Sequence, residues 1–422
     1  MKELDLTTLR SAVAGSAVAV RSITRLQPAG GPGDKVFPPT YMKEKGAETK
    51  YALERRRIEG RESLTVLLDS VASQANRMEE ALLEAWRRKE IDFPLVEVDF
   101  SGETGLEDIG QITALQTPHR IADALLRDSL LDGQLFRFSD PGRAFTDSRP
   151  NHATGMYRYC PTALIFGVWD STGPKGGLGA KFQRCMVSEI IGVDVVGGVK
   201  TASRLDPLGI EKKAGPVFQH PDPKERWTLD ESVAMKEGKG KPVPVGGSGD
   251  KGSPSAINHG NIPPTIDSEA GGVTMSHALQ TAVFSLAGLR RLRFVTDIKG
   301  AVLPAASRDE AELAARTALA ALGLAGLAYL RQSDFDLRSR SLLVPEAPSS
   351  YELLGRDGQP ATQFALTTGG AAKLLAEAAS AAQKLGLGWD RGPITLKPAP
   401  KLAALVRKSR ELTQAGSGSE SD

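Results

Sequence analysis

The feature that most constrains this chain is a long segment near its middle, residues 208–272, that shows little helical or strand periodicity. The segment is rich in proline, glycine, lysine and aspartate, and it is far longer than the connections inside compact domains. It is therefore either an inserted subdomain or a mobile arm. We expect a core assembled from residues 1–207 and 273–414, and a disordered tail over 415–422.

Composition excludes several classes of protein. Hydrophobic residues make up 40% of the 422 residues, which is enough for a sizeable core. The net charge of +2 excludes a uniformly basic coat for nucleic acid, although local basic strips are compatible with it. Two cysteines exclude a disulfide framework or a cysteine-rich zinc site, and fit a reducing cytoplasm. Five scattered histidines without paired spacing predict no metal, and no cofactor motif is present.

Hydrophobic periodicity predicts an α+β chain without a membrane span. The longest apolar run, residues 318–330, is shorter than the ~20 residues that a span needs. An amphipathic helix is predicted over 69–89, with Asp69 or Ser70 as its N-cap. The other predicted helices are 121–131, 309–331 and 371–385, and the predicted strands are 18–23, 95–100, 162–169, 186–196 and 289–295.

A glycine-rich loop is the first candidate for chemistry. Residues 173–181 follow a predicted strand and contain four glycines and two lysines. Such a loop exposes backbone N–H groups to a phosphate, although it is neither a Walker A loop nor a Rossmann turn. The alternative is a surface turn that needs positive φ angles. The candidate phosphate-binding residues are Lys175, Gly176, Gly177, Lys181 and Arg184.

Three further segments have residue types that contact nucleic acid. Basic residues flank a Gly/Pro loop after the first strand, although charge on an edge strand also serves to prevent aggregation. Polar residues near the start of the long helix can contact phosphates or bases, or can simply be solvated. Residues 145–159 mix basic residues with tyrosines, or form a polar loop. The candidates are Arg21, Arg25 and Lys35; Gln74, Asn76 and Arg77; and Arg149 and His152.

Four of these segments, in order, resemble one known family. The segments RLQPAGGPGDKVFPPTY, LLDSVASQANRMEEALLEA, TPHRIADALLRDS and PTALIFGVWDSTGPKGGLGAKF lie between residues 25 and 182. Together they resemble the RAMP-superfamily backbone subunit of type I-G (formerly I-U) CRISPR Cascade complexes. The similarity covers roughly residues 9–196 and continues more weakly through 275–345.

The resemblance implies an RRM-like (ferredoxin-like) palm with inserted finger and thumb elements. It also implies a non-enzymatic subunit that polymerises along the spacer of the crRNA and presents it to complementary target DNA in antiviral defence. The implied partners are crRNA, target DNA, other copies of the subunit, other Cascade subunits and a recruited helicase-nuclease. Sequence reading is then left to base pairing, while the protein contacts the RNA backbone.

The resemblance also ranks the candidate residues and leaves one alternative function. The glycine loop comes first for backbone contact, the first strand and its loop second, and the long helix third, with 208–272 as the candidate thumb. The alternative is an RNA endonuclease, because related backbone subunits of type III complexes cut target RNA with a loop aspartate after the first strand. Asp34 occupies a comparable place here, although turn aspartates are also common for their own hydrogen bonds.

Overall fold

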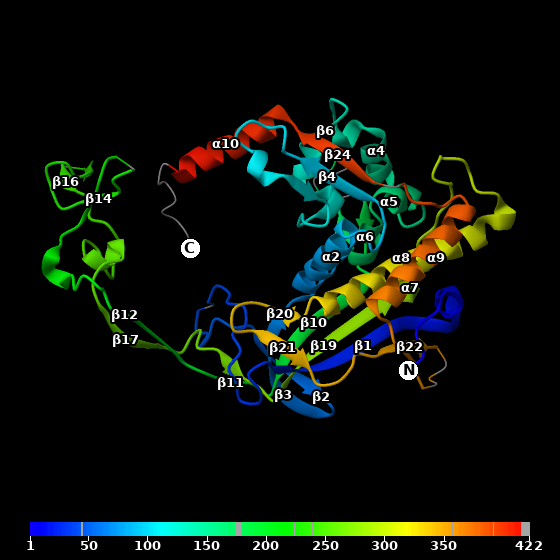
Figure 1. Cartoon of the computed structure of the whole chain (residues 1–422), viewed down its shortest axis with the longest axis horizontal. Helices are drawn as coiled ribbons and strands as arrows, with labels where there is room; N and C mark the ends of the chain where they lie inside the picture. The colour runs from blue at the N-terminus through cyan, green and yellow to red at the C-terminus, as the bar shows by residue number, and fades with distance from the viewer. Residues whose placement is uncertain are drawn as a thin grey trace. The chain divides into compact units, whose positions relative to one another are not determined.

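A computed structural model describes residues 1–43, 45–171, 173, 179–222, 224–238, 240–356, 358, 360–390 and 392–414 (Figure 1). The chain divides into two compact units. The first comprises Met1–Met42, Tyr51–Val196 and Val273–Ala403, and the second Lys43–Lys50, Gly197–Gly272 and Ala404–Asp422. The first unit is therefore assembled from both halves of the chain. The predicted tail, 415–422, lies outside the described residues.

The first unit is built on an antiparallel sheet in the order β2-β3-β10-β19-β1-β21-β20, with β22 also pairing with β1 and β23 pairing with β22. Its strands are β1 (Ala17–Pro28), β2 (Leu53–Ile58), β3 (Arg61–Asp69), β10 (Met186–Val193), β19 (His277–Ser285), β20 (Phe335–Asp336), β21 (Leu342–Pro345), β22 (Tyr351–Gly355) and β23 (Thr362–Phe364). In β1 the side chains of Ser22, Thr24 and Leu26 are buried while Ile23 and Arg25 are exposed, which is the two-residue period of a strand with one covered face.

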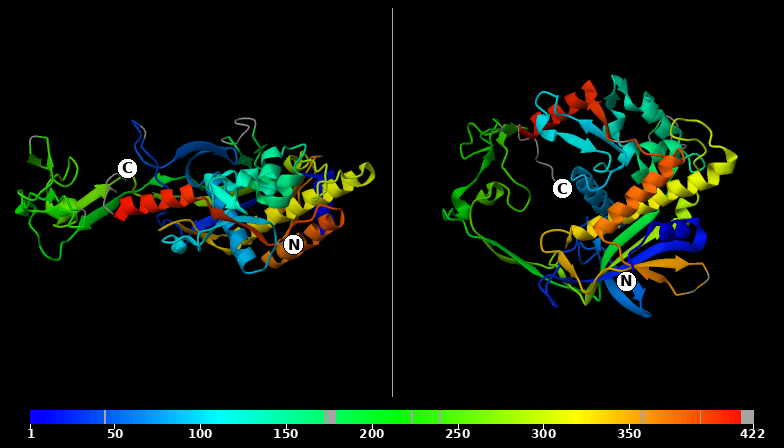
Figure 2. Two further views of the ribbon diagram at one scale, coloured as in Figure 1. Left: turned by 90° about the horizontal axis from the view of Figure 1, so that it is seen from above. Right: turned by 45° about the vertical axis from the view of Figure 1, so that its right-hand side comes forward.

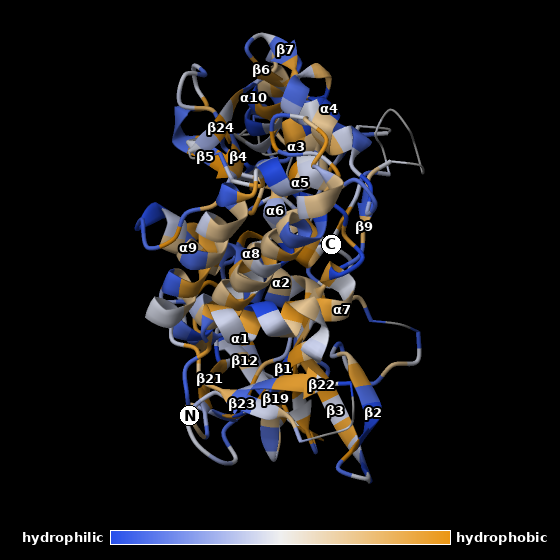
Figure 3. Cartoon of the chain, turned by 90° about the vertical axis from the view of Figure 1, so that its right-hand side faces the viewer, coloured by the Kyte–Doolittle hydropathy of each residue, from blue (hydrophilic) through white to orange (hydrophobic). Residues whose placement is uncertain are grey.

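Helices cover one face of this sheet, as Figure 3 shows. They are α1 (Leu6–Ser11), α2 (Val71–Arg87), α7 (Leu286–Leu289), α8 (Ala305–Gln332) and α9 (Thr368–Lys384). Helices α8 and α9 run side by side in both views of Figure 2. By length and composition α8 could cross a membrane, but 94% of its apolar window is buried inside the protein. It is the central core helix of this unit, since it packs on its neighbours on every side.

A smaller sheet with short helices completes the first unit. Its order is β5-β4-β24-β6-β7, in which only β4 and β24 are parallel. The strands are β4 (Leu95–Asp99), β5 (Gln111–Thr113), β6 (Ser129–Leu131), β7 (Gln134–Leu135) and β24 (Pro393–Pro398). The helices are α3 (Ala124–Arg127), α4 (Asp140–Asp147), α5 (Thr154–Tyr159) and α6 (Pro161–Phe166), and a separate hairpin joins β8 (Val168–Trp169) to β9 (Lys181–Phe182).

The second unit contains a two-stranded ribbon that ends in a small folded tip. The ribbon pairs β12 (Lys200–Arg204) with β17 (Ile262–Asp267). The tip holds β13 (Phe218–Gln219), β14 (Trp227–Thr228), β15 (Lys236–Glu237) and β16 (Lys241–Pro242). The chain also forms β11 (Val196–Gly197), β18 (Val273–Thr274) and α10 (Pro400–Gln414). The middle segment of this unit starts at Gly197, before residue 208, because the first strand of the ribbon precedes the irregular segment.

Most predicted elements are confirmed, and three are wrong. Ser70 caps α2 by accepting a hydrogen bond from the backbone N of Ser73, as predicted. Residues 162–169, predicted as a strand, are mainly helical, and Pro161 starts helix α6. Every residue of α6 is buried, so the sequence has no alternation of apolar and polar residues that would distinguish a helix from a strand. Residues 121–131 are broken into a 3₁₀ turn, α3 and strand β6. Residues 289–295 leave α7 as irregular chain.

Candidate nucleic-acid interface

A basic groove of about 890 Å³ opens beside the β8–β9 hairpin in the first unit. Its walls come from residues 118–120, the end of α6, the hairpin, the start of β10 and the segment after α7. Four cationic side chains line the groove: Arg120, Lys181, Arg184 and Arg291. His119 lines it as well. None of the described residues lining the groove is Asp or Glu. The groove therefore has the electrostatic character that attracts phosphate.

Two of its arginines, Arg120 and Arg184, lie near one buried carboxylate, that of Glu79. Arg120 binds Glu79 of α2 through two hydrogen bonds of 2.7 Å, and both side chains are buried. Arg120 also donates to the carbonyl of Gly167 at 3.0 Å, and its backbone has a φ of 52°, an unusual conformation for arginine. Burial raises the pKa of the Glu79 carboxyl to about 7, against the opposing attraction of Arg120.

Arg184 adds a second positive charge next to this ion pair. Burial, followed by repulsion from Arg120, lowers the pKa of its guanidinium, which nevertheless stays charged. Its Nε donates to the carbonyl of Phe166 at 3.1 Å. Two guanidinium groups thus lie near one carboxylate, and the excess positive charge favours an anionic ligand in the groove.

The hairpin places an aromatic ring beside a lysine at the groove's edge. Trp169 and Lys181 are directly opposite each other in the β8–β9 register, so their side chains share one face. The Lys181 Nζ lies 5.1 Å from the centre of the Trp169 ring, within the range of a cation–π contact. Both side chains are exposed, and both line the groove.

The glycine loop connects the two strands of this hairpin. Lys175, Gly176 and Gly177 lie outside the described residues. The base of the loop is described: the backbone N of Asp170 donates to the carbonyl of Ala180 at 2.9 Å, and the buried Asp170 carboxylate binds Arg137 at 2.6 and 2.8 Å. This buried pair anchors the point at which the predicted phosphate-binding loop leaves the fold.

The candidates on the first strand lie elsewhere, on the outer face of the large sheet. Arg21 pairs with Glu352 at 2.8 Å and Arg25 with Glu346 at 3.0 Å, so carboxylates offset both charges. Lys35 lies in the loop after β1, where its backbone N donates to Asp34. Contact between these residues and RNA remains a prediction, and the structure does not bring them to the groove.

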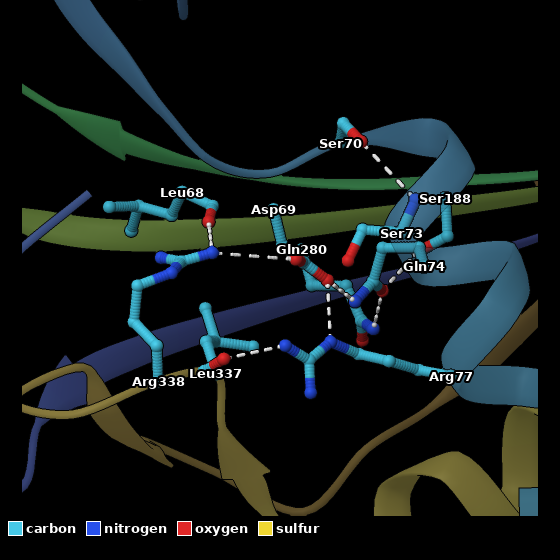
Figure 4. A network of polar contacts seen from close by, with 10 residues as sticks. All are labelled: Leu68, Asp69, Ser70, Ser73, Gln74, Arg77, Ser188, Gln280, Leu337 and Arg338. Atoms are coloured by element: carbon cyan, nitrogen blue, oxygen red, sulfur yellow. Dashed lines mark hydrogen bonds and ion pairs between the residues drawn. The ribbon is translucent and has the colours of Figure 1, made fainter. Parts of the chain in front are cut away.

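The candidates on α2 differ in exposure, and two of them, Gln74 and the half-buried Arg77, belong to the polar network of Figure 4. Asn76 is exposed, whereas Gln74 is completely buried. The Gln74 amide donates to Asp69 at 2.6 Å and accepts from Ser188 and Gln280, each at 2.9 Å. Gln74 therefore has no surface for contact with RNA, and its prediction is corrected to a structural role: it ties α2 to the sheet.

Arg77 also serves this network. Its Nε donates to the buried Asp69 at 3.0 Å, and its Nη2 donates to the carbonyl of Leu337 at 2.6 Å. Arg149 donates to the carbonyls of Thr146 and Ser148, and it forms a backbone bridge with the exposed His152. Both guanidinium groups donate hydrogen bonds within the fold, and neither residue lines the groove, so they are weaker candidates than Lys181 and Arg184.

Sequence reasoning missed four residues of the groove: His119, Arg120, Trp169 and Arg291. Trp169 lies four residues before Gly173, the first residue of the glycine loop, so this proximity in the sequence could have identified it. Arg120 and Arg291 could not be assigned from the sequence. They are distant from the loop along the chain, and only the tertiary fold brings them to it.

The part of the chain that carries most of the groove also matches a known protein family. Residues 20–196, from β1 to the start of β11, match the family model described as CRISPR-associated protein GSU0053 (Cas_GSU0053). No curated protein matches the chain. The match includes the groove residues His119, Arg120, Trp169, Lys181 and Arg184, and it confirms the CRISPR association that the sequence segments predicted. The part of the chain that carries most of the groove is thus similar to a CRISPR-associated protein family, which indicates a CRISPR-related role.

Proposed function

We propose that this protein is a crRNA-binding backbone subunit of a type I CRISPR Cascade complex, specifically of type I-G. Copies assemble along the spacer and present it for pairing with target DNA. The observation that carries the proposal is the cationic groove whose described lining residues include no carboxylate, and which lies mostly within the segment matched by the CRISPR-associated family. Such a groove binds the RNA backbone and leaves sequence reading to base pairing.

The strand order supports an RRM-like palm. Taken along the chain, β1, α2, β10, β19, α8 and β22 alternate as strand, helix, strand, strand, helix and strand. In the sheet these strands lie in the order β10-β19-β1-β22, and each pair is antiparallel. A ferredoxin-like fold has the same order of elements and strands. In this proposal the β2–β3 hairpin and the smaller sheet are insertions into the palm.

The second unit is the proposed thumb. Its ribbon and tip are inserted between β10 and β19, and its exposed apolar side chains suit contact with a neighbouring subunit. The other proposed partners are the remaining Cascade subunits and the helicase-nuclease that degrades the target. The subunit itself binds and does not cut, and it works in the cytoplasm.

Charge reversal in the groove tests RNA binding. Lys181→Glu together with Arg184→Glu should weaken binding of single-stranded RNA by roughly 10- to 100-fold at low salt. The slope of log Kd against log salt should fall by about one to two, equally for every spacer sequence. Fluorescence anisotropy at several salt concentrations measures both quantities.

A matched control is Lys384→Glu together with Arg87→Glu, since both residues lie outside the groove. The control should leave affinity nearly unchanged. Sequencing the RNA that copurifies with the full chain should give one defined length with constant repeat-derived ends. If the charge-reversal variant loses RNA affinity only for some spacer sequences, or loses none, the assignment of the groove is contradicted.

A further inference from the structure

We propose that the groove holds one unpaired nucleobase of the bound RNA, stacked on the indole of Trp169, with the adjoining phosphate at Lys181. This inference rests on the proposed RNA-binding function and adds to it a ligand group and a residue role.

Trp169 is exposed in a setting where its neighbours are buried. Its exposed fraction is 55%, whereas Val168 on one side is 7% exposed and Asp170 on the other is 1% exposed. Tryptophan is a large apolar side chain that proteins usually cover. Because the ring lines a groove and not a flat surface, a ligand in the groove is a direct way to cover it.

The ring stands on a rigid base. Val168 and Phe182 are paired across the hairpin and both are buried beneath it. The buried Asp170–Arg137 pair fixes the next residue, and the Asp170–Ala180 hydrogen bond closes the loop. A platform held in this way loses little conformational entropy when a base stacks on it.

The charges around the ring suit a nucleotide and not an apolar side chain alone. Lys181 lies over the indole, where it can pair with the phosphate of a base stacked on the same ring. Arg120 is paired with Glu79, while the nearby Arg184 has no carboxylate bonded to it among the described residues. Arg291, whose Nη1 donates to Gln183 at 2.7 Å, adds a further positive charge to the groove.

The size and form of the site favour a single-stranded ligand. A volume of about 890 Å³ is in the range of small-molecule sites and accommodates one nucleotide. A base inside a duplex has both faces covered by its neighbours, so stacking on Trp169 requires a base that has left the stack. The groove therefore distinguishes an unpaired nucleotide from a paired one.

The test uses the full chain and short single-stranded RNAs that each carry one abasic nucleotide, at successive positions. Trp169→Ala should weaken binding of the intact RNA by about 5- to 150-fold, the effect of removing one base-stacking aromatic. Trp169→Phe should restore most of the affinity. Phe138→Ala is the matched control, since Phe138 is also 55% exposed and does not line the groove. It should leave affinity unchanged.

The abasic series identifies the base. One abasic position should weaken binding to the original protein by the same factor as Trp169→Ala, and should have no further effect on that variant. If Trp169→Ala binds as tightly as the original while Lys181→Glu with Arg184→Glu does not, the groove binds backbone alone and the inference fails. If none of these changes affects RNA binding, the proposed function of the groove fails as well.

Discussion

At the scale of the residue, a buried carboxylate organises the cationic groove. Glu79 projects from α2 and fixes Arg120, which in turn bonds the carbonyl that ends α6. Breaking a buried ion pair leaves the remaining charge unpaired and costs several kcal/mol, about 3–5 in measured cases. Glu79 is therefore a positioning residue for Arg120 in the groove.

The role of Asp34 distinguishes a protein that only binds RNA from one that also cleaves it. Its Oδ1 accepts a hydrogen bond from the backbone N of Lys35 at 2.8 Å, so the carboxylate already has a role in the turn. We expect purified complex with divalent metal to leave complementary RNA whole, measured on a denaturing gel over hours. Asp34→Ala should leave target interference in cells unchanged. RNA cleavage that disappears in Asp34→Ala would instead establish the endonuclease alternative.

Gln74 and Trp169 show what the sequence could and could not predict about the site. A polar residue near the start of an amphipathic helix is usually solvated, and that expectation holds for Asn76. Gln74 differs because Asp69, Ser188 and Gln280 supply buried partners from three strands, a tertiary arrangement that no local pattern reveals. Conversely, local loop chemistry alone singled out Lys181 and Arg184 as phosphate contacts. The structure places both in the groove, and their contact with phosphate stays a prediction.

At the scale of the element, the core depends on how closely α8 approaches the large sheet. A Cβ on Gly323 would lie 2.6 Å from the Cζ atom of Phe284 in β19, whose ring is buried. At Gly326 the nearest atom is Leu82 Cδ1, at 3.3 Å. The helix therefore needs glycine at the first position for packing, while the second has more room.

The two glycines give a matched pair of variants with the same chemical change. Gly323→Ala should lower the free energy of unfolding by about 1–3 kcal/mol, because overpacking outweighs the gain in helix propensity. Gly326→Ala should be near neutral, or stabilising by up to about 1 kcal/mol. Urea unfolding of both variants measures the difference. Equal changes in the free energy of unfolding at the two positions would show that the Phe284 ring can move aside without loss of stability.

Element types were predictable where one face is exposed and one is buried. The amphipathic α2 and the alternating β1 carry that signal. Helix α6 does not, because it is buried all round, and a short apolar run then has no period to distinguish helix from strand. The extent of α8 was predicted to within four residues, as 309–331, but only its packing shows that it is a core element.

At the scale of the whole molecule, the irregular middle of the chain becomes a ribbon with a folded tip. Residues rich in glycine and proline were expected to form a subdomain or a mobile arm, and tertiary hydrogen bonds favour the subdomain. The backbone N of Val245 donates to the carbonyl of Val217, and the base of the tip is closed by a bond from the backbone N of Gly260 to Asp206. The sequence pattern was too aperiodic to predict these pairings.

The tip and ribbon also carry apolar side chains that face solvent. Leu205 is 87% exposed, and large exposed fractions are shared by Leu208, Leu229, Val233 and Ile266. Exposed apolar side chains on one unit are typical of surfaces that contact another protein. A net charge of only +2 allows copies to pack side by side without strong repulsion.

These features predict a head-to-tail array whose length follows the guide RNA. A contact between the tip of one copy and a different surface of the next is heterologous, and such contacts generate open filaments when the rotation does not close. Each copy binds a short RNA segment weakly, and contact with its neighbour raises the effective concentration on the strand. Native mass spectrometry on guides of increasing length should therefore show copies added in steps.

The bond between Asp206 and Gly260 allows a clean deletion of the tip, since replacing residues 207–259 with a short glycine linker keeps the ribbon closed. The deletion should leave binding of the first copy within about twofold, because the groove belongs to the first unit. It should reduce cooperativity between copies by tenfold or more, as the loss of a linked site does. A fixed oligomer at every guide length, or a closed ring without RNA, would contradict the array, whereas unchanged cooperativity after the deletion would locate the contact outside the tip.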